Sequence, residues 1–227
     1  MAAKESKGSS CCTSKWLKIF FVISLLLSVF IGLDQIKERF YIFDQDVLEK
    51  IAQENIAKYP NDTRALMHGI ATDLDREYPG HVELKEEWVF NNAGGAMGSM
   101  WILHGSITEY VIIFGTPVGT EGHTGRFLAD DYFIILEGEQ WAYSAGAVER
   151  EVFQPGEMHH LPRGQVQQYK IPERAWALEY ARGWIPLMLP FGFADSLFST
   201  VDFITIGNQV RLYGKALLGE LFLKGKI

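Results

Sequence analysis

Cysteine is scarce in this chain: its 227 residues include 2 cysteines, Cys11 and Cys12, and they are adjacent. A disulfide framework needs several spaced cysteines, so none is predicted, and cysteine usage leaves the redox compartment open. Phosphate-binding glycine motifs and spaced clusters of metal ligands are also missing, so we expect no cofactor and no metal. The net charge of −7, with no basic stripe, argues against a nucleic-acid partner.

Long apolar runs are rare as well, and the clearest one covers residues 19–33. Fifteen helical residues span about 22 Å, which is short of a hydrocarbon core of about 30 Å. Lys18 can extend its amine to the membrane surface and Trp16 can lie at the interface. The run therefore predicts a transmembrane anchor over residues 16–36. A cleaved signal peptide is the rival interpretation, although the small-x-small cleavage site is missing.

Charge around the anchor predicts its orientation. Lysines precede the run at four positions, Lys4, Lys7, Lys15 and Lys18, whereas opposite charges nearly cancel in residues 34–39. The positive-inside rule then predicts a cytosolic tail over residues 1–15 and a lumenal main domain. Cys11 and Cys12 could carry lipid or stay unmodified, and a glycosylation sequon at Asn61 is usable only on a lumenal domain.

Residues 37–84 are predicted to form a helical linker region. Apolar residues recur at helical spacing over residues 43–58 and 63–77, and Asp44 or Asp46 can cap the first helix. The remaining length, with a hydrophobic content of 48%, is sufficient for one folded domain with a real core.

From residue 85 to residue 186 the pattern changes to short strands separated by glycine turns. Strands are predicted at residues 87–90, 108–114, 132–136, 148–153, 165–170 and 176–180. Many short strands with glycine turns indicate a sandwich or small barrel, and their order is similar to a cupin-type jelly roll. Most cupins bind metal through histidines, but His159 and His160 are adjacent on a strand and must face opposite sides.

The strand over residues 175–181 carries a carboxylate in an unusual position. Alternation places Glu179 on a face that is otherwise alanine, whereas Trp176, Leu178 and Tyr180 form the other face. A carboxylate buried without partners is costly, so it pairs or its pKa rises. Glu179 is our catalytic candidate; the alternative is an edge strand with Glu179 in water.

A second strand repeats this arrangement. Asp131 shares a strand face with Phe133, whereas Asp130 lies on the opposite face and is expected in water. Asp131 is therefore our second catalytic candidate. Tyr110, Ile112 and Phe114 share one face of their own strand, and Glu109, on the other face, is expected to be structural.

The C-terminal segment, residues 187–227, is predicted to contain two helices at residues 190–206 and 208–224. Neither contains an uninterrupted apolar run long enough to span a membrane. A helical pair that lies on the membrane or covers the mouth of the barrel fits better, and packing on a soluble sheet is the alternative.

Several motifs resemble a known family. Residues 85–98 (KEEWVFNNAGGAMG) are close to a signature of the fungal C-8 sterol isomerases, which share a family with the animal sigma receptor of the non-opioid type. The same holds for residues 103–104, 109–110, 114–116, 119–125, 129–133, 183–186 and 189–193. The similarity is continuous from about residue 85 to about residue 202.

The resemblance implies a mainly β fold with flanking helices: a cupin-like barrel, one N-terminal span and two membrane-apposed helices. It also implies an endoplasmic reticulum location and a trimer. The pocket carboxylate of the family falls on Glu179. The second carboxylate of the animal receptor falls where this chain has Phe133, and Asp131 could take its place.

The expected function is isomerisation of an ergosterol precursor, with the B-ring double bond moving from C8–C9 to C7–C8. A non-enzymatic binder of sterols or cationic amphiphilic amines is the alternative, and such amines are expected as inhibitors of the enzyme. The residues expected to line the sterol pocket are Tyr110, Ile112, Phe114, Thr124, Phe127, Phe133, Ala177, Ile185, Leu189 and Phe191.

Overall fold

The computed structural model describes residues 10–227, with side chains from Lys15 onward, and the chain forms two compact units. In the first unit, helix α1 (Ser10–Ile36) leads into the short 3-10 helix η1 (Lys37–Phe40). The segment Lys15–Phe40 is long and apolar enough to cross a membrane, which agrees with the predicted anchor. Helix α1 begins at Ser10, within the predicted tail and before the predicted anchor at residue 16, because extending a helix costs far less than nucleating one. Residues 1–9, and the side chains of Cys11 and Cys12, lie outside the described part.

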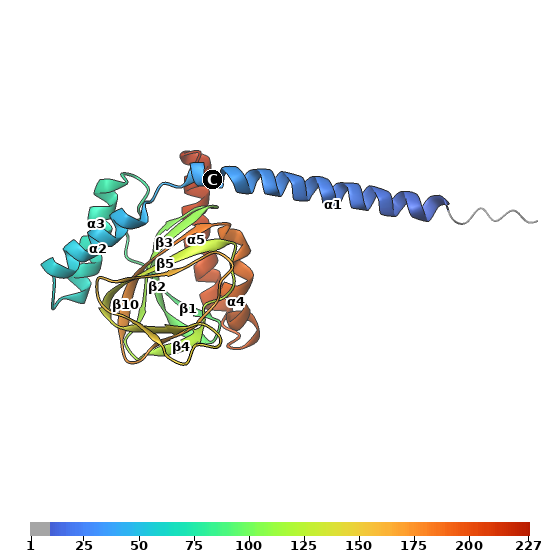
Figure 1. The fold of residues 1–227 in the computed structure, drawn as a ribbon. Helices are drawn as coiled ribbons and strands as arrows, with labels where there is room; N and C mark the ends of the chain where they lie inside the picture. The colour runs from blue at the N-terminus through green and yellow to red at the C-terminus, as the bar shows by residue number, and fades with distance from the viewer. Residues whose placement is uncertain (1–9) are drawn as a thin grey trace, which may run out of the picture. The chain divides into compact units, whose positions relative to one another are not determined.

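The second unit, Phe40–Ile227, begins with the two predicted helices, α2 (Gln45–Lys58) and α3 (Thr63–Glu77) (Figure 1). Aspartates begin both helices. The side chain of Asp44 accepts hydrogen bonds from the backbone of Asp46 and Val47, and that of Asp62 accepts one from Ala65. Such caps satisfy backbone N–H groups that have no partner within the helix.

Ten strands follow. They are β1 (Trp88–Ala93), β2 (Ala96–Gly105), β3 (Glu109–Thr116), β4 (Thr120–His123), β5 (Ala129–Gly138), β6 (Gln140–Tyr143), β7 (Glu151–Phe153), β8 (Met158–Leu161), β9 (Gln168–Ile171) and β10 (Ala175–Gly183). Six of them overlap the predicted strands. The others, β2, β4, β6 and β8, were not predicted, because β2 is long and glycine-containing and the rest are four-residue strands of mixed polarity. Their pairing partners, rather than their own propensity, place them in the sheets.

The strands form two sheets with the order of a jelly roll. The six-stranded sheet has the order β1-β2-β3-β10-β5-β8, and the four-stranded sheet has the order β4-β9-β6-β7. From β3 to β10 the chain therefore crosses between the sheets after almost every strand, which is the double-sheet arrangement found in cupins. The predicted fold class, mainly β with flanking helices, is confirmed, and β1 and β2 extend one sheet by a hairpin.

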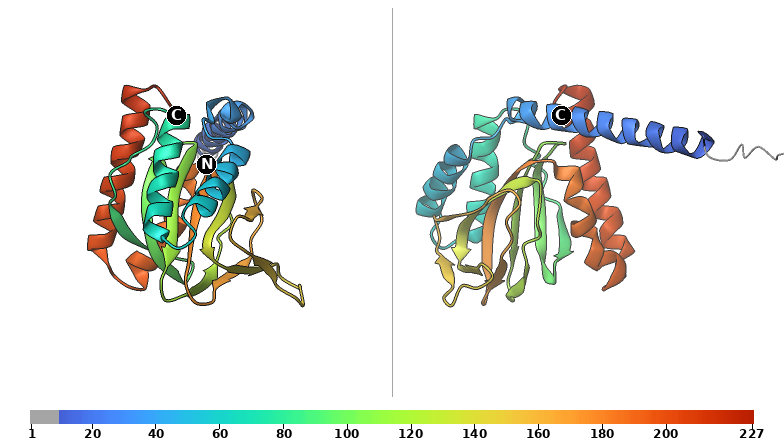
Figure 2. Two further views of the ribbon diagram at one scale, coloured as in Figure 1. Left: turned by 90° about the vertical axis from the view of Figure 1, so that its left-hand side faces the viewer. Right: turned by 45° about the vertical axis from the view of Figure 1, so that its right-hand side comes forward.

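The two faces of the six-stranded sheet are packed differently, and Figure 2 shows the helices that lie beside the strands. Its outer face presents Trp101, Ile113, Leu178 and Tyr180, among others, to the buried side of α2 and α3. Its inner face presents small and apolar side chains, which cluster as Ile102, Ile112, Phe114, Phe133, Ile135, Ala175 and Ala177. Strand alternation thus separates a solid core from the interior of the barrel.

The C-terminal helices differ from their predicted bounds. They are α4 (Leu189–Phe198) and α5 (Phe203–Leu223), so the helix predicted over residues 190–206 is in fact broken. Val201 has a φ of 53° in the break, and Asp202 caps α5 by accepting a hydrogen bond from the Thr205 backbone. A valine with positive φ cannot continue a helix.

Candidate active site

Strand β10 carries Glu179 to the interior of the barrel, as alternation predicts. Ala175 and Ala177 on the same face belong to the inner cluster, whereas Leu178 and Tyr180 belong to the outer core. The strand pairs with β3 on one side and β5 on the other, where Glu179 lies opposite Ile112 and Phe133. The Glu179 carboxylate is therefore inside the fold, and the alternative of an edge strand in water is excluded.

The Glu179 carboxylate accepts a hydrogen bond from the hydroxyl of Tyr110, which projects from β3. Burial raises the pKa of Glu179 to about 7, against the opposing effect of that hydrogen bond. Burial, followed by the charge of Glu179, also raises the pKa of Tyr110, so the phenol stays protonated and remains the donor. Near neutral pH, Glu179 can both lose and regain a proton.

Asp131 reaches the same space from β5. It lies opposite Ala181 of β10, and its Oδ1 is buried without a hydrogen-bond partner among the described residues. Burial raises the pKa of Asp131 well above its usual range, and the negative charge of Glu179 raises it further. Two buried carboxyl groups this close do not both ionise readily, so one of the pair holds a proton at neutral pH, and the larger rise favours Asp131 as that acid.

Asp130 is on the other face of the strand, as predicted. Its carboxylate meets His160 at 3.2 Å and accepts a hydrogen bond from the backbone N–H of Arg163 at 3.1 Å, at a partly exposed surface. The two histidines of β8 also separate as predicted. His159 is buried, whereas His160 stacks on Tyr132 outside the barrel, with ring centroids 4.4 Å apart.

Both carboxylates border one cavity of about 190 Å³ that both sheets and helices α4 and α5 enclose. The predicted lining residues that border it are Tyr110, Ile112, Phe114, Thr124, Phe127, Phe133, Ile185, Leu189 and Phe191. Ala177 does not reach the cavity surface; it is fully buried in the cluster behind it. An alanine side chain is too short to pass the larger side chains of neighbouring strands.

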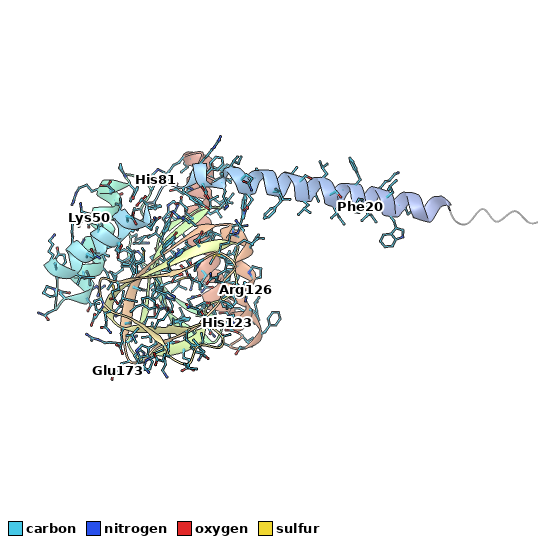
Figure 3. All side chains as sticks on the ribbon, in the orientation of Figure 1. Phe20, Lys50, His81, His123, Arg126 and Glu173 are labelled. Atoms are coloured by element: carbon cyan, nitrogen blue, oxygen red, sulfur yellow. The ribbon has the colours of Figure 1, made fainter. Side chains whose placement is uncertain are left out.

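Several lining residues were not predicted: Asn91, Ala93, Met100, Ile102, His123, Gln140, His159, Leu161, Tyr169, Met188, Gly192, Phe193, Gln209 and Tyr213. Many of them lie on strands that the sequence did not reveal, or on α5, whose position depends on packing. The signal available for His159 was its alternation with His160. His123, labelled in Figure 3, accepts a hydrogen bond from the Gly125 backbone at 2.9 Å and lies beside Phe191 of α4.

A second group of titratable residues lies away from the two carboxylates. His81, His104 and Glu220 bring potential ligand atoms within 4.8 Å of one another, and Figure 3 labels His81 at the upper end of the unit. Glu220 is already engaged by His81 at 2.8 Å and by Lys224 at 2.5 Å, and His104 Nδ1 meets the His81 carbonyl at 2.9 Å. Burial lowers the pKa of His104 to about 4. These contacts tie α5 to the segment before β1, in agreement with a structural role for His104.

Comparison with known proteins gives consistent relatives. A sequence model of the family described as "ERG2 and Sigma1 receptor like protein" matches residues 20–225. A protein of Gibberella zeae named C-8 sterol isomerase ERG2 is 52% identical, with 99% of this chain and 98% of the relative covered. The C-8 sterol isomerase erg2 of Aspergillus fumigatus is 50% identical, over 97% of this chain and 93% of the relative.

More distant matches were also found. Sigma non-opioid intracellular receptor 1 of Xenopus tropicalis is 40% identical over 79% of this chain and 81% of the relative. Among solved structures, the cupin domain of Cnp3 from Schizosaccharomyces pombe matches 40% of this chain and 69% of that chain, with a TM-score of 0.35 and 14% identity.

Proposed function

Because the chain belongs to the family of ERG2 and Sigma1 receptor like proteins, we propose that it is a C-8 sterol isomerase. It moves the B-ring double bond of an ergosterol precursor from C8–C9 to C7–C8. The observation that carries this proposal is that the carboxyl groups of Asp131 and Glu179 both border one largely apolar cavity and that each has a raised pKa. The names of two fungal relatives, which are 52% and 50% identical in sequence over nearly the full chain, support the same reaction.

The pair supplies both proton transfers of this isomerisation. Asp131, which holds a proton, donates it to C9, and the alkene electrons form the new C9–H bond. The positive charge that develops at C8 faces the Glu179 carboxylate. Glu179 then removes a proton from C7, and the electrons of that C–H bond form the C7–C8 double bond. After the product leaves, Glu179 releases its proton to solvent and Asp131 takes one up from solvent, which restores the starting state.

The cavity favours the cation for an electrostatic reason. In a water-excluded site a fixed carboxylate stabilises a developing positive charge far better than bulk water does, because it needs no reorganisation. The Tyr110 hydroxyl holds the Glu179 carboxylate in place through its hydrogen bond. Tyr110 therefore orients the charge, and the apolar lining excludes the water that would capture the cation.

The decisive experiment is turnover of a C8–C9 unsaturated sterol by the purified full chain in deuterium oxide. We expect a C7–C8 unsaturated product with one deuterium at C9, since the proton that Asp131 donates exchanges with solvent. The Glu179→Gln variant serves as the matched inactive control. Binding of the sterol without any product would overturn the proposal and favour the receptor-like alternative.

Cationic amphiphilic amines are proposed as inhibitors on the same grounds. An ammonium group beside Glu179 mimics the charge of the intermediate, and such mimics bind more tightly than substrates do. A neutral isostere of equal size should bind much more weakly, as measured by competition for sterol turnover. Equal affinities would show that apolar burial alone accounts for binding.

We also propose an arrangement in the endoplasmic reticulum membrane. Residues 16–36 form the span, 1–15 the cytosolic tail, 37–84 the helical linker, 85–186 the lumenal barrel and 187–227 a membrane-apposed pair. Exposed apolar side chains on the last two helices support this, including Phe198, Phe203, Ile204 and Phe222. A C-terminal tag should be protected from protease in sealed microsomes; digestion of the tag would reverse the orientation. The trimer implied by resemblance is tested by light scattering in detergent.

A further inference from the structure

A second polar group, which includes His159, borders the cavity two strands away from Glu179 of the carboxyl pair. On β8, His159 lies opposite Phe133 of β5, and Phe133 in turn lies opposite Glu179 of β10. His159 and Glu179 are therefore two strands apart in one row, roughly 10 Å between backbones at the usual strand spacing. The Phe133 side chain occupies the cavity wall between them.

The hydrogen-bond network fixes the tautomer of His159, starting from Gln167. The Gln167 side-chain amide donates to the Ser144 hydroxyl at 3.2 Å and to the Glu151 carboxylate at 3.1 Å, so its nitrogen is assigned. Its oxygen therefore faces His159 Nε2, at 2.7 Å. An amide oxygen is an acceptor, so Nε2 must carry the hydrogen and donate it.

The other ring nitrogen of His159 then acts as an acceptor. Burial lowers the pKa of His159, so the ring is neutral at pH 7 and has a single N–H group. As placed, the side-chain oxygen of buried Gln140, Oε1, lies 2.8 Å from this Nδ1, so two acceptors would face one another. The two ends of an amide are nearly isosteric, and their assignment follows the partners. Gln140 must turn its NH₂ toward Nδ1, which directs its carbonyl oxygen away from the histidine, in a residue that borders the cavity.

We propose that Gln140, held by His159, accepts a hydrogen bond from the 3-hydroxyl group of the sterol; this rests on the proposed function. A sterol is apolar except for that hydroxyl on its A ring, and the reacting alkene lies across the neighbouring B ring. Anchoring the hydroxyl two strands from Glu179 leaves the rings over Phe133 and brings the alkene to the carboxyl pair. Gln140 and His159 thus determine which carbons meet the acid and the base.

Two other hydroxyl groups at the cavity are used by the fold. The Thr124 hydroxyl bonds to the Gln167 carbonyl at 3.1 Å, and the Tyr213 hydroxyl donates to the Ser106 carbonyl at 2.5 Å. Gln209 of α5 donates to the Phe90 carbonyl at 2.8 Å, although its buried Oε1 has no partner among the described residues. Gln209 is therefore the competing acceptor, and it is the matched control for Gln140.

The test is a series of C8–C9 unsaturated sterols that differ only at C3, with kcat/KM measured on the full chain. The wild-type chain should prefer the 3-hydroxyl over the 3-deoxy compound by more than about tenfold, because a site built to bind a hydroxyl rejects its absence. The 3-ketone, which accepts but cannot donate, should be as poor as the 3-deoxy compound. This comparison needs no variant, so folding cannot confound it.

Variants then assign the residue. In Gln140→Met the hydroxyl preference should collapse toward unity, whereas Gln209→Met should keep it; thermal unfolding checks that both fold. A wild-type chain that turns over all three compounds equally would overturn the inference, as would loss of preference in Gln209→Met alone. Absence of turnover on every compound would instead overturn the proposed isomerase function.

Discussion

Strands β3 and β10 carry two tyrosine–glutamate pairs, one on each face of the same sheet. On the inner face, the Tyr110 hydroxyl of β3 donates to Glu179 of β10. On the outer face the roles of the strands are exchanged, and the Tyr180 hydroxyl of β10 donates to Glu109 of β3 at 2.7 Å. The residue types and the strands are the same, so any difference between the pairs comes from their surroundings.

In the outer pair, the buried Glu109 carboxylate has hydrogen-bond donors and a counter-charge. Glu109 is fully buried, yet its carboxylate accepts hydrogen bonds from the backbone N–H groups of Ile42 at 2.8 Å and Phe43 at 3.1 Å. Lys226 adds an ion pair at 2.7 Å. Glu109 thereby joins the start of the second unit to its C-terminal tail. A buried charge with these partners is structural, and removing Glu109 would leave its donors, Lys226 above all, without their acceptor.

The inner pair lacks such compensation. Burial outweighs the hydrogen bond from Tyr110 and raises the pKa of Glu179 to about 7, and the neighbouring Asp131 holds a proton. The same tyrosine–glutamate pair thus has a balanced charge where a cation lies beside it and a raised pKa where it faces an apolar cavity, which is why we place the chemistry on the inner pair. Four predictions follow from this difference, in order of decreasing effect.

Replacing the inner glutamate should abolish turnover without unfolding the chain. Glu179→Gln keeps the shape of the side chain and an acceptor for Tyr110, but it removes the charge that faces the cation. We expect kcat to fall by about 10²–10⁴-fold, the usual contribution of a general acid or base. Circular dichroism should remain that of the wild type. A variant with normal turnover would remove Glu179 from the mechanism.

Asp131→Asn should be similarly damaging, and Asp130→Asn should be the matched mild control. The adjacent aspartates lie on opposite faces, and Asp130 meets His160 at a partly exposed surface. The double variant Glu179→Gln/Asp131→Asn should be little worse than either single variant, because residues that act as a unit are not additive. Near-normal kcat in Asp131→Asn would leave Glu179 working with Tyr110, a histidine or water.

Replacing the outer glutamate should cost stability rather than chemistry. Glu109→Gln leaves the buried ammonium of Lys226 without its counter-charge, so the free energy of unfolding should fall by about 3–5 kcal/mol. The measurement is thermal unfolding of the detergent-solubilised full chain. Adding Lys226→Met should recover part of the loss, since it removes the unpaired charge. Activity per folded molecule should change little, and a selective loss of kcat would erase the contrast between the faces.

Replacement of the two tyrosines should affect the pH dependence of kcat differently. Glu179 acts ionised, so kcat should fall about tenfold per pH unit as pH drops below its pKa of about 7. The hydrogen bond from Tyr110 lowers that pKa, so Tyr110→Phe should move the acidic limb to higher pH and reduce kcat at pH 7. Tyr180→Phe should leave the limb in place and cost about 1 kcal/mol of stability. If the acidic limb of the kcat–pH profile is unchanged in Tyr110→Phe, a group other than Glu179 controls that limb.

Local patterns in the sequence determined the N-terminal helices, the faces of the two central strands and the family of this protein. The apolar run of α1, the helices α2 and α3, and the alternation that turns Glu179 and Asp131 to one side and Tyr180 and Asp130 to the other all follow from a repeat of two or 3.6 residues. The family also follows from contiguous motifs. Each of these properties depends on neighbours a few positions away, so the order of residues suffices.

Tertiary structure decided which partners surround the buried charges on those faces. Lys226 neutralises Glu109 across more than a hundred residues, and Gln140 of β6 and His159 of β8 come from different sheets and meet Gln167 of the loop before β9. The short strands β4, β6 and β8 form only because partners pair with them, and the break at Val201 divides a segment that local pattern predicted as one helix. Whether a buried carboxylate is inert or reactive depends on which distant charges and dipoles surround it, and chain folding alone brings those together.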